Sequence, residues 1–190
     1  MSMTSGALLG AALLLAIYAI SMYNRLVAVK HGVDKAWANI DVLLRQRHDE
    51  LPKLVTVCQQ HQHFEQATLE KVIAARAQVQ SARERRDLAA LGRAEGDLRG
   101  GLGQLFAVAE AYPELRASES FQQLHSRISQ LEDGIADRRE FYNEAVNIHN
   151  VRIEQFPDNL IASRFGFTAR TLLAFSAAEK ADVDLKALFS

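Results

Sequence analysis

The chain has 190 residues and a formal net charge of −1, and only three of its residues are proline. The balanced charge argues against a body that binds nucleic acid or another polyanion. The abundance of Ala, Leu, Gln, Glu and Arg favours long helices separated at Pro52, Pro113 and Pro157.

The N-terminal segment predicts a membrane anchor. Residues 1–24 carry no charged side chain, and the 19 residues of the apolar run 6–24 would form a helix of about 28 Å, close to the ~30 Å hydrocarbon core of a bilayer. No basic residue precedes the run and no Ala-x-Ala pattern ends it, which argues against a cleaved signal peptide. A buried core helix would show a polar face. The predicted anchor side chains are Leu8, Leu9, Leu13, Leu14, Leu15, Ile17, Tyr18 and Ile20.

Basic residues follow the anchor and none precedes it. Arg25, Lys30 and Lys35 lie just after the run, so the positive-inside rule predicts a single-pass protein with a short external N-terminus and a cytoplasmic body. The lone thiol, Cys58, cannot form an internal disulfide, which suits a reducing compartment.

Four long helices and a shorter one are expected. The first continues the anchor to about Arg47, with apolar residues at helical spacing. The second starts near Asp49 as N-cap, with Pro52 in its first turn, and its stripe continues past residue 61. The apolar positions are Tyr23, Leu26, Val33, Trp37, Ile40 and Leu44 in the first helix, and Leu51, Leu54, Cys58, His61, Glu65, Val72 and Val79 in the second.

The third helix is predicted over residues 87–111 and is unusually rich in glycine. Because each glycine destabilises a helix interior by about 0.5–1 kcal/mol relative to alanine, two interpretations stay open. The backbone packs closely against a neighbour, or the helix breaks near Gly100. The glycines are Gly92, Gly96, Gly100, Gly101 and Gly103.

The fourth helix is expected to open at Ser118 and to run for nearly 40 residues, uninterrupted at Asp133-Gly134 because the apolar stripe stays in register across it. That stripe includes Phe121, Leu124, Ile128, Leu131, Ile135, Tyr142, Val146, His149, Ile153 and Phe156. A short helix over residues 158–164 and an apolar tail follow. The tail, which includes Phe165, Phe167, Phe175, Leu185, Leu188 and Phe189, could pack on the bundle, the bilayer or another subunit.

No catalytic or cofactor motif stands out in the sequence. His61 and His63 are two residues apart, so on a helix they would point in nearly opposite directions, unlike a metal pair at i, i+4. An aromatic or histidine ring followed by Asn recurs at Tyr23-Asn24, Tyr142-Asn143 and His149-Asn150. These amides either form inter-helix hydrogen bonds or face water. No catalytic residue, cofactor or metal site is therefore predicted.

A set of short motifs resembles the LemA family of bacterial membrane-anchored helical proteins. The motifs include Tyr23-Asn24-x-Leu26-Val27, Ala36-Trp37, Ile40-Asp41-Val42, Arg47-x-Asp49, His63, Glu110-Ala111-Tyr112-Pro113-Glu114-Leu115, Tyr142-Asn143, Asn150, Phe156-Pro157 and Phe165-Gly166-Phe167. His149 departs from the family pattern, in which a tyrosine is usual. The resemblance implies an N-terminal signal anchor in a bacterial cell membrane and an antiparallel bundle of long helices. It supplies no activity.

These features predict an all-α protein with three parts: an anchor over residues 1–24, a long-helix bundle over 25–156, and a tail over 157–190. The leading hypothesis is a non-enzymatic membrane-anchored scaffold or adaptor that self-assembles as a homo-oligomer on the bilayer. Alternatives are a regulatory docking partner of a membrane enzyme such as a protease, and a membrane-shaping protein. Candidate packing or oligomer contacts are Tyr23, Asn24, Trp37, Gly92, Gly96, Gly100, Tyr142, Asn143, Phe165 and Phe167.

Overall fold

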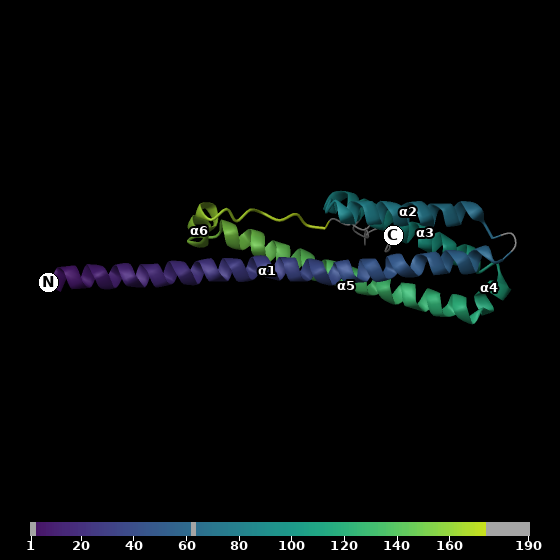
Figure 1. Ribbon diagram of the computed structural model, residues 1–190, viewed down its shortest axis with the longest axis horizontal. Helices are drawn as coiled ribbons and strands as arrows, with labels where there is room; N and C mark the ends of the chain where they lie inside the picture. Colours follow the sequence, from purple (N-terminus) through teal and green to yellow (C-terminus); the bar gives the residue numbers. More distant parts are fainter. Residues whose placement is uncertain (1–2, 62–63, 174–190) are drawn as a thin grey trace, which may run out of the picture. The chain divides into compact units, whose positions relative to one another are not determined.

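The computed structural model describes residues 3–61 and 64–173, and the elements found there are all helices. Figure 1 shows them in chain order. They are α1 (Met3–Gln59), α2 (Gln66–Glu84), α3 (Leu88–Ala109), α4 (Pro113–Ala117), α5 (Glu119–Glu154) and α6 (Asp158–Arg164). The predicted all-α class is confirmed. The tail positions Phe175, Leu185, Leu188 and Phe189, like His63, lie outside the described residues.

The chain divides into two compact units, and α1 and α5 each contribute to both. The first unit contains residues 3–40 and 138–172. In it the C-terminal part of α5 runs antiparallel to α1, and α6 turns the chain back (Figure 1). Its interior is formed by Met22, Leu26, Val33 and Ile40 of α1 with Tyr142, Val146 and His149 of α5.

The second unit contains the described residues of 41–137 together with Leu173. Here α2 and α3 pack closely against each other, and the remaining parts of α1 and α5 complete the unit. Its core side chains come from every long helix: Leu44, Leu51, Leu54, Cys58, Val72, Val79, Leu91, Leu98, Leu105, Phe121, Ile128 and Ile135. This arrangement is a helical bundle, as the apolar stripes predicted.

The predicted helix boundary near Asp49 is wrong, because α1 continues through Pro52 to Gln59. Proline has no N–H, so the carbonyl of residue i−4, His48, loses its partner within the helix. Arg76 of α2 supplies the missing donor: its Nε donates to the His48 carbonyl oxygen at 3.0 Å. The neighbouring helix thus compensates for a proline that would otherwise interrupt α1.

The turn that the sequence placed near residue 48 occurs instead between α1 and α2. The described part of this turn includes Phe64, which is buried and stacks near Tyr112 with 5.4 Å between ring centroids. The predicted stripe through His61 and Glu65 therefore belongs to a turn and not to a helix interior. A buried aromatic side chain holds this turn, a feature that helical periodicity does not reveal.

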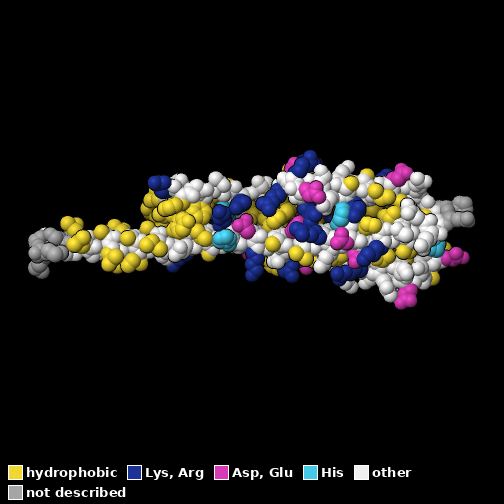
Figure 2. Space-filling view, in the orientation of Figure 1, with side chains coloured by type: hydrophobic (Ala, Val, Ile, Leu, Met, Phe, Trp, Pro, Cys, Tyr) yellow, Lys and Arg dark blue, Asp and Glu magenta, His cyan; other side chains and the backbone are white. Residues whose placement is uncertain are grey.

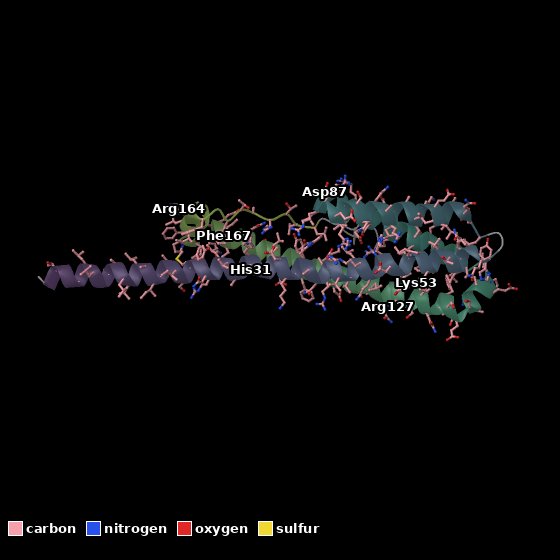
Figure 3. The ribbon with its side chains drawn as sticks, in the orientation of Figure 1. His31, Lys53, Asp87, Arg127, Arg164 and Phe167 are labelled. Atoms are coloured by element: carbon pink, nitrogen blue, oxygen red, sulfur yellow. The ribbon has the colours of Figure 1, made fainter. Side chains whose placement is uncertain are left out.

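The glycine-rich segment forms one continuous helix, α3, which begins after Asp87. Asp87 lies at the turn before α3 (Figure 3), and its carboxylate accepts a hydrogen bond from the backbone N–H of Ala90 at 2.9 Å. A Cβ at Gly101 would lie 3.4 Å from Val72 Cγ2, whereas one at Gly100 or Gly103 would meet no atom of the described residues within 4 Å. The close-packing interpretation therefore holds at Gly101, and the helix does not break near Gly100.

The fourth predicted helix is present as α5, which begins one residue after Ser118 and passes uninterrupted through Asp133-Gly134. A Cβ at Gly134 would lie 3.3 Å from Leu43 Cδ1, so this glycine permits a close approach of α5 to α1. The short helix after Pro157 is also confirmed as α6. Phe156 departs from the prediction: it ends the stripe but is 79% exposed, because the helix ends at Glu154.

Candidate functional site

The N-terminal part of α1 carries the predicted anchor side chains on its surface. It is the one described helix that is long and apolar enough to cross a bilayer, and its large apolar side chains from Leu8 to Ile20 are exposed. Figure 2 shows hydrophobic side chains along this segment and, in the same unit, around α6. An apolar helix with no protein packed on it has the features of a membrane anchor.

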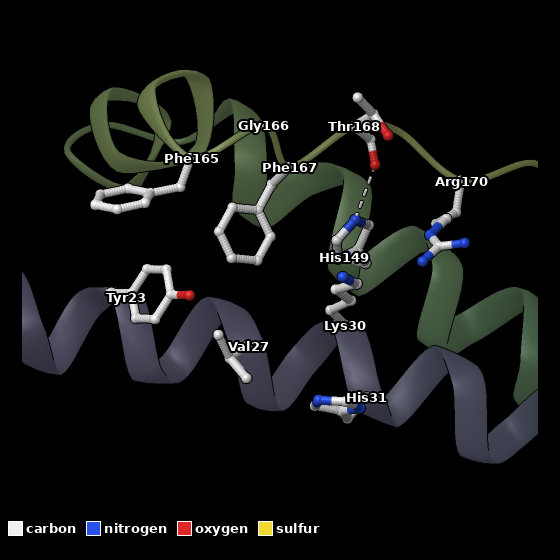
Figure 4. Close-up of a pocket in the computed structure, with 10 residues that line it drawn as sticks. All are labelled: Tyr23, Val27, Lys30, His31, His149, Phe165, Gly166, Phe167, Thr168 and Arg170. Carbon is white, nitrogen blue, oxygen red and sulfur yellow. Dashed lines mark hydrogen bonds between the residues drawn. The ribbon is translucent and has the colours of Figure 1, made fainter.

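A pocket of about 310 Å³ lies in the first unit just after the anchor (Figure 4). Its lining comes from α1, from α5 and from the segment after α6. The residues are Tyr23, Val27, Lys30 and His31 of α1, His149 of α5, and Phe165, Gly166, Phe167, Thr168 and Arg170 of the segment after α6. The Tyr23 ring contacts Phe165 and Phe167 at centroid distances of 4.9 Å and 5.9 Å. Gly166 has a φ of +70°, a left-handed conformation that glycine adopts without strain.

The charged part of the lining is basic. Lys30 and Arg170 point toward the same space from opposite walls, and the ten described residues of the lining include no Asp or Glu. Asp34, outside the lining, lies 3.7 Å from Arg170 Nη2 and 3.9 Å from His31 Nδ1. Its side chain is half exposed, so solvent screens both of these ion pairs.

Three side chains of α5 hold the segment after α6 against the bundle. Asn150 forms two hydrogen bonds with the backbone of Arg170: its Nδ2 donates to the carbonyl at 2.9 Å, and its Oδ1 accepts from the N–H at 2.8 Å. The Tyr142 hydroxyl donates to the Thr171 carbonyl at 3.0 Å, and His149 Nε2 lies 3.1 Å from the Thr168 carbonyl oxygen. The tail up to Leu172 therefore packs on the bundle.

Burial raises the pKa of the Tyr142 hydroxyl, although the nearby Arg170 charge opposes this effect. Tyr142 therefore stays protonated and can donate to the Thr171 carbonyl throughout the neutral pH range.

A buried ion cluster joins three helices of the second unit. Arg47 of α1 is 1% exposed, and its guanidinium lies 2.5 Å from both Glu95 of α3 and Glu132 of α5. Burial alone would lower the pKa of Arg47, but the charges of the two carboxylates outweigh burial and raise it. Arg99 adds a second contact to Glu132 at 3.5 Å. These charges are matched to each other, as a structural cluster requires.

Two other titratable groups of the second unit, His48 and Cys58, are also held within its packing. His48 Nε2 lies 2.7 Å from Arg76 Nη2, and burial together with the Arg76 charge lowers the pKa of His48. The Cys58 thiol is fully buried, which raises its pKa to about 11. A neutral histidine that accepts from arginine and an unreactive thiol are structural groups.

An open groove of about 440 Å³ lies between α2 and α3 in the second unit. Its floor is made of small residues, and longer polar side chains stand around it. The lining consists of Lys71, Ala74, Ala75, Gln78, Gly96, Asp97, Gly100, Gly101 and Gln104. Small residues on a helix face let another helix approach closely.

The predicted contact residues fall into separate groups. Tyr23, Phe165 and Phe167 come together at the pocket, and Trp37 contacts Tyr142 with 5.8 Å between ring centroids. Gly96 and Gly100 line the α2–α3 groove, whereas Gly92 is buried. Asn24 is exposed and Asn143 is half-buried. Of the asparagines that follow a ring, Asn150 bonds to the backbone of Arg170 in the tail and, among the described residues, to no neighbouring helix.

Sequence reasoning missed the basic pocket and the Arg47 cluster. Arg47 occupies the position in the apolar stripe between Leu44 and Leu51, and a charged residue in that register indicates a buried ion pair. Lys30 similarly interrupts the stripe beyond the anchor, but its proximity to Arg170 depends on the chain reversal at α6. No group of three or more possible metal ligands occurs among the described residues.

Comparisons with known proteins agree with this architecture. The family model described as the LemA family matches residues 36–186. Magnetosome proteins MamQ 1 and MamQ 2 of Paramagnetospirillum magneticum are each 26% identical to the chain over 168 residues, which cover 76% of this chain and 62% of each relative. Protein LemA of Metamycoplasma hominis is 26% identical over 166 residues, covering 87% of this chain and 74% of that protein. The chain thus spans less than two thirds of the length of the MamQ relatives.

Proposed function

This chain belongs to the LemA family, and from that premise we propose that it is a non-enzymatic, membrane-anchored helical scaffold or adaptor that self-assembles on the bilayer. The observation that carries the proposal is the exposed apolar helix at residues 6–20, which continues without interruption into the helical body. Anchoring in one plane raises the effective concentration of the bodies and favours their association.

The interior of the body supports a structural role. The buried charge of Arg47 is matched by Glu95 and Glu132, and Arg76 is engaged by His48. Groups poised for catalysis typically combine a perturbed pKa with an open cleft, whereas these side chains bond to each other across helices. The buried polar side chains of the body therefore stabilise the helical bundle.

The groove between α2 and α3 is the surface through which we propose that copies associate. Gly100, which lines this groove, has open space among the described residues where a Cβ would lie, so packing against them does not require glycine there. Gly100 nevertheless destabilises α3 by about 0.5–1 kcal/mol relative to alanine. A helix from a neighbouring copy that packs on this face would offset that cost.

The test is the mass of the full-length protein in lipid nanodiscs or mild detergent, measured by light scattering. We expect a discrete assembly, and we expect Gly100→Leu to shift it toward monomer because the added side chain fills the groove. Ala107→Leu is the matched control, since Ala107 is an exposed residue of α3 outside the groove lining. A monomeric wild-type protein would contradict self-assembly and favour a docking partner of a membrane enzyme.

A further inference from the structure

If the apolar run spans the bilayer, the basic pocket falls at the depth of the lipid headgroups. Lys30 is six residues beyond the end of the apolar run at Asn24, or about 9 Å along the helix axis. Each headgroup layer is roughly 5–8 Å thick, and a lysine side chain reaches back toward it. Tyr23, which also lines the pocket, would then lie at the interface, where aromatic rings concentrate in membrane proteins.

The turn around α6 supports this depth. Phe156, Leu160 and Phe165 are more than half exposed, and the Phe165 ring contacts Tyr23 at the end of the anchor. Figure 2 shows this hydrophobic surface in the same unit as the apolar part of α1. Exposed apolar side chains beside a membrane helix are stabilised when they enter the bilayer interface.

The lining is suited to a phosphate group. Lys30 and Arg170 approach the cavity from opposite walls (Figure 4), and Lys30 forms no ion pair within the described chain. Arg170 is only partly neutralised by Asp34, at 3.7 Å. Because Asn150 fixes the Arg170 backbone through two hydrogen bonds, the guanidinium projects from a defined position. Arginine and lysine are the side chains that bind phosphate oxygens most strongly.

His149 adds a second kind of recognition. Its Nε2 faces the Thr168 carbonyl, which can only accept, so in the neutral ring the proton resides on Nε2. The Nδ1 atom is then a buried acceptor that has no hydrogen-bond partner among the described residues, although the ring is 1% exposed and lines the pocket. A buried acceptor without a partner costs free energy, and a ligand hydroxyl would satisfy it.

We propose that this pocket binds the headgroup of an anionic glycerophospholipid from the surrounding bilayer, with phosphatidylglycerol as the model ligand. Lys30 and Arg170 contact the phosphate, and His149 Nδ1 accepts a hydrogen bond from a headgroup hydroxyl. The volume of about 310 Å³ lies at the lower end of the range for small-molecule sites. This inference rests on the anchoring part of the proposed function and is independent of self-assembly.

The experiment uses the full-length protein reconstituted into vesicles of equal parts phosphatidylglycerol and phosphatidylcholine. Flotation of the vesicles first establishes membrane attachment. The protein is then extracted in mild detergent, and the retained lipid is identified by native mass spectrometry. We expect phosphatidylglycerol to be retained in preference to phosphatidylcholine. A protein that does not float contradicts anchoring itself, whereas one that floats without lipid preference overturns the pocket alone.

Variants that remove a positive charge and a variant that removes a negative charge should change phosphatidylglycerol retention in opposite directions. Lys30→Gln or Arg170→Gln should lower phosphatidylglycerol retention about fivefold each, the effect of removing one basic side chain near an anionic surface. Asp34→Asn should raise retention, because it frees Arg170 and His31. Arg25→Gln is the control, because Arg25 follows the apolar run directly, lies nearer the bilayer than Lys30 and is outside the lining. If Arg25→Gln has an equal effect, the attraction is general and the site is refuted. Circular dichroism verifies that each variant folds.

Two further ligands define the chemistry. Phosphatidylmethanol has the same charge as phosphatidylglycerol but no headgroup hydroxyl, so we expect weaker retention, and equal retention would remove His149 from the site. Excess inorganic phosphate or glycerol 3-phosphate should not displace the lipid, because neither contributes apolar chains. Displacement by either would assign the pocket to a soluble phosphate compound and overturn the lipid assignment.

Discussion

Arg47 shows how one buried side chain ties distant parts of the sequence together. It joins α1 to Glu95 and Glu132, which lie 48 and 85 residues further along the chain. Removing one partner from a buried ion cluster leaves an uncompensated charge and commonly costs about 3–5 kcal/mol. Breaking this cluster should therefore lower the free energy of unfolding far more than breaking an exposed ion pair would.

We expect Arg47→Met to lower the free energy of unfolding by about 3–5 kcal/mol, and we expect adding Glu95→Gln to restore part of that loss. The measurement is chemical denaturation in mild detergent, followed by circular dichroism. Arg45→Met is the matched control, because Arg45 is exposed and pairs with Asp41 within one helix. That exposed pair should contribute less than about 1 kcal/mol. Equal effects of the two variants would show that the buried cluster does not stabilise the bundle.

His48 should make stability depend on pH. Its pKa is lowered in the folded protein by burial and by the Arg76 charge, so the unfolded chain binds the proton more tightly. The contribution of His48 is therefore complete above its ordinary pKa of about 6.5 and declines as the pH falls below that value.

His48→Gln retains an acceptor for Arg76 but does not titrate. We expect melting temperatures measured between about pH 7.5 and pH 5.5 to fall less steeply for this variant than for the wild-type protein. Parallel curves for the two proteins would exclude His48 as the source of the pH dependence.

At the scale of elements, the segment after α6 depends on side chains of α5. Asn150→Ala removes both hydrogen bonds to the Arg170 backbone. An unmade hydrogen bond to a buried group costs about 1–3 kcal/mol, so amide exchange at Arg170 should accelerate about tenfold or more. Hydrogen-exchange mass spectrometry of the peptide over residues 165–172 measures this, with exposed Asn147→Ala as control. Unchanged exchange would mean that other contacts hold the segment.

Helix α1 illustrates why element boundaries are hard to read from sequence. Pro52 normally indicates a helix start, and Asp49 is a suitable N-cap, so local preference favoured a break. The break does not occur because Arg76, on another helix, donates to the carbonyl that Pro52 leaves without a partner. By contrast, the register of the apolar stripe correctly predicted that α5 passes through Asp133-Gly134 without a break. In the structure, Gly134 leaves room for the Leu43 side chain of α1.

At the scale of the whole molecule, we propose that the apolar N-terminal part of α1 attaches the protein to a membrane. A charged residue at the centre of a membrane helix costs about 2.5–3.5 kcal/mol on insertion scales. We expect Leu15→Arg to reduce the fraction of protein that floats with vesicles, whereas Leu15→Ile should float like the wild-type protein. Unchanged flotation of Leu15→Arg would show that membrane attachment lies elsewhere in the chain. Light scattering of the wild-type protein then tests assembly separately from attachment.

The sequence by itself determined the helical class, the apolar anchor and most core positions, because helical periodicity and hydropathy are local properties of neighbouring residues. The tertiary structure decided the course of α1 past Pro52, the burial of Arg47 and the juxtaposition of Lys30, His149 and Arg170. Each of these depends on groups that are distant in sequence, and their pairing energy arises only when the helices pack. Residues that are unremarkable within their own helix thereby form a basic pocket beside the anchor.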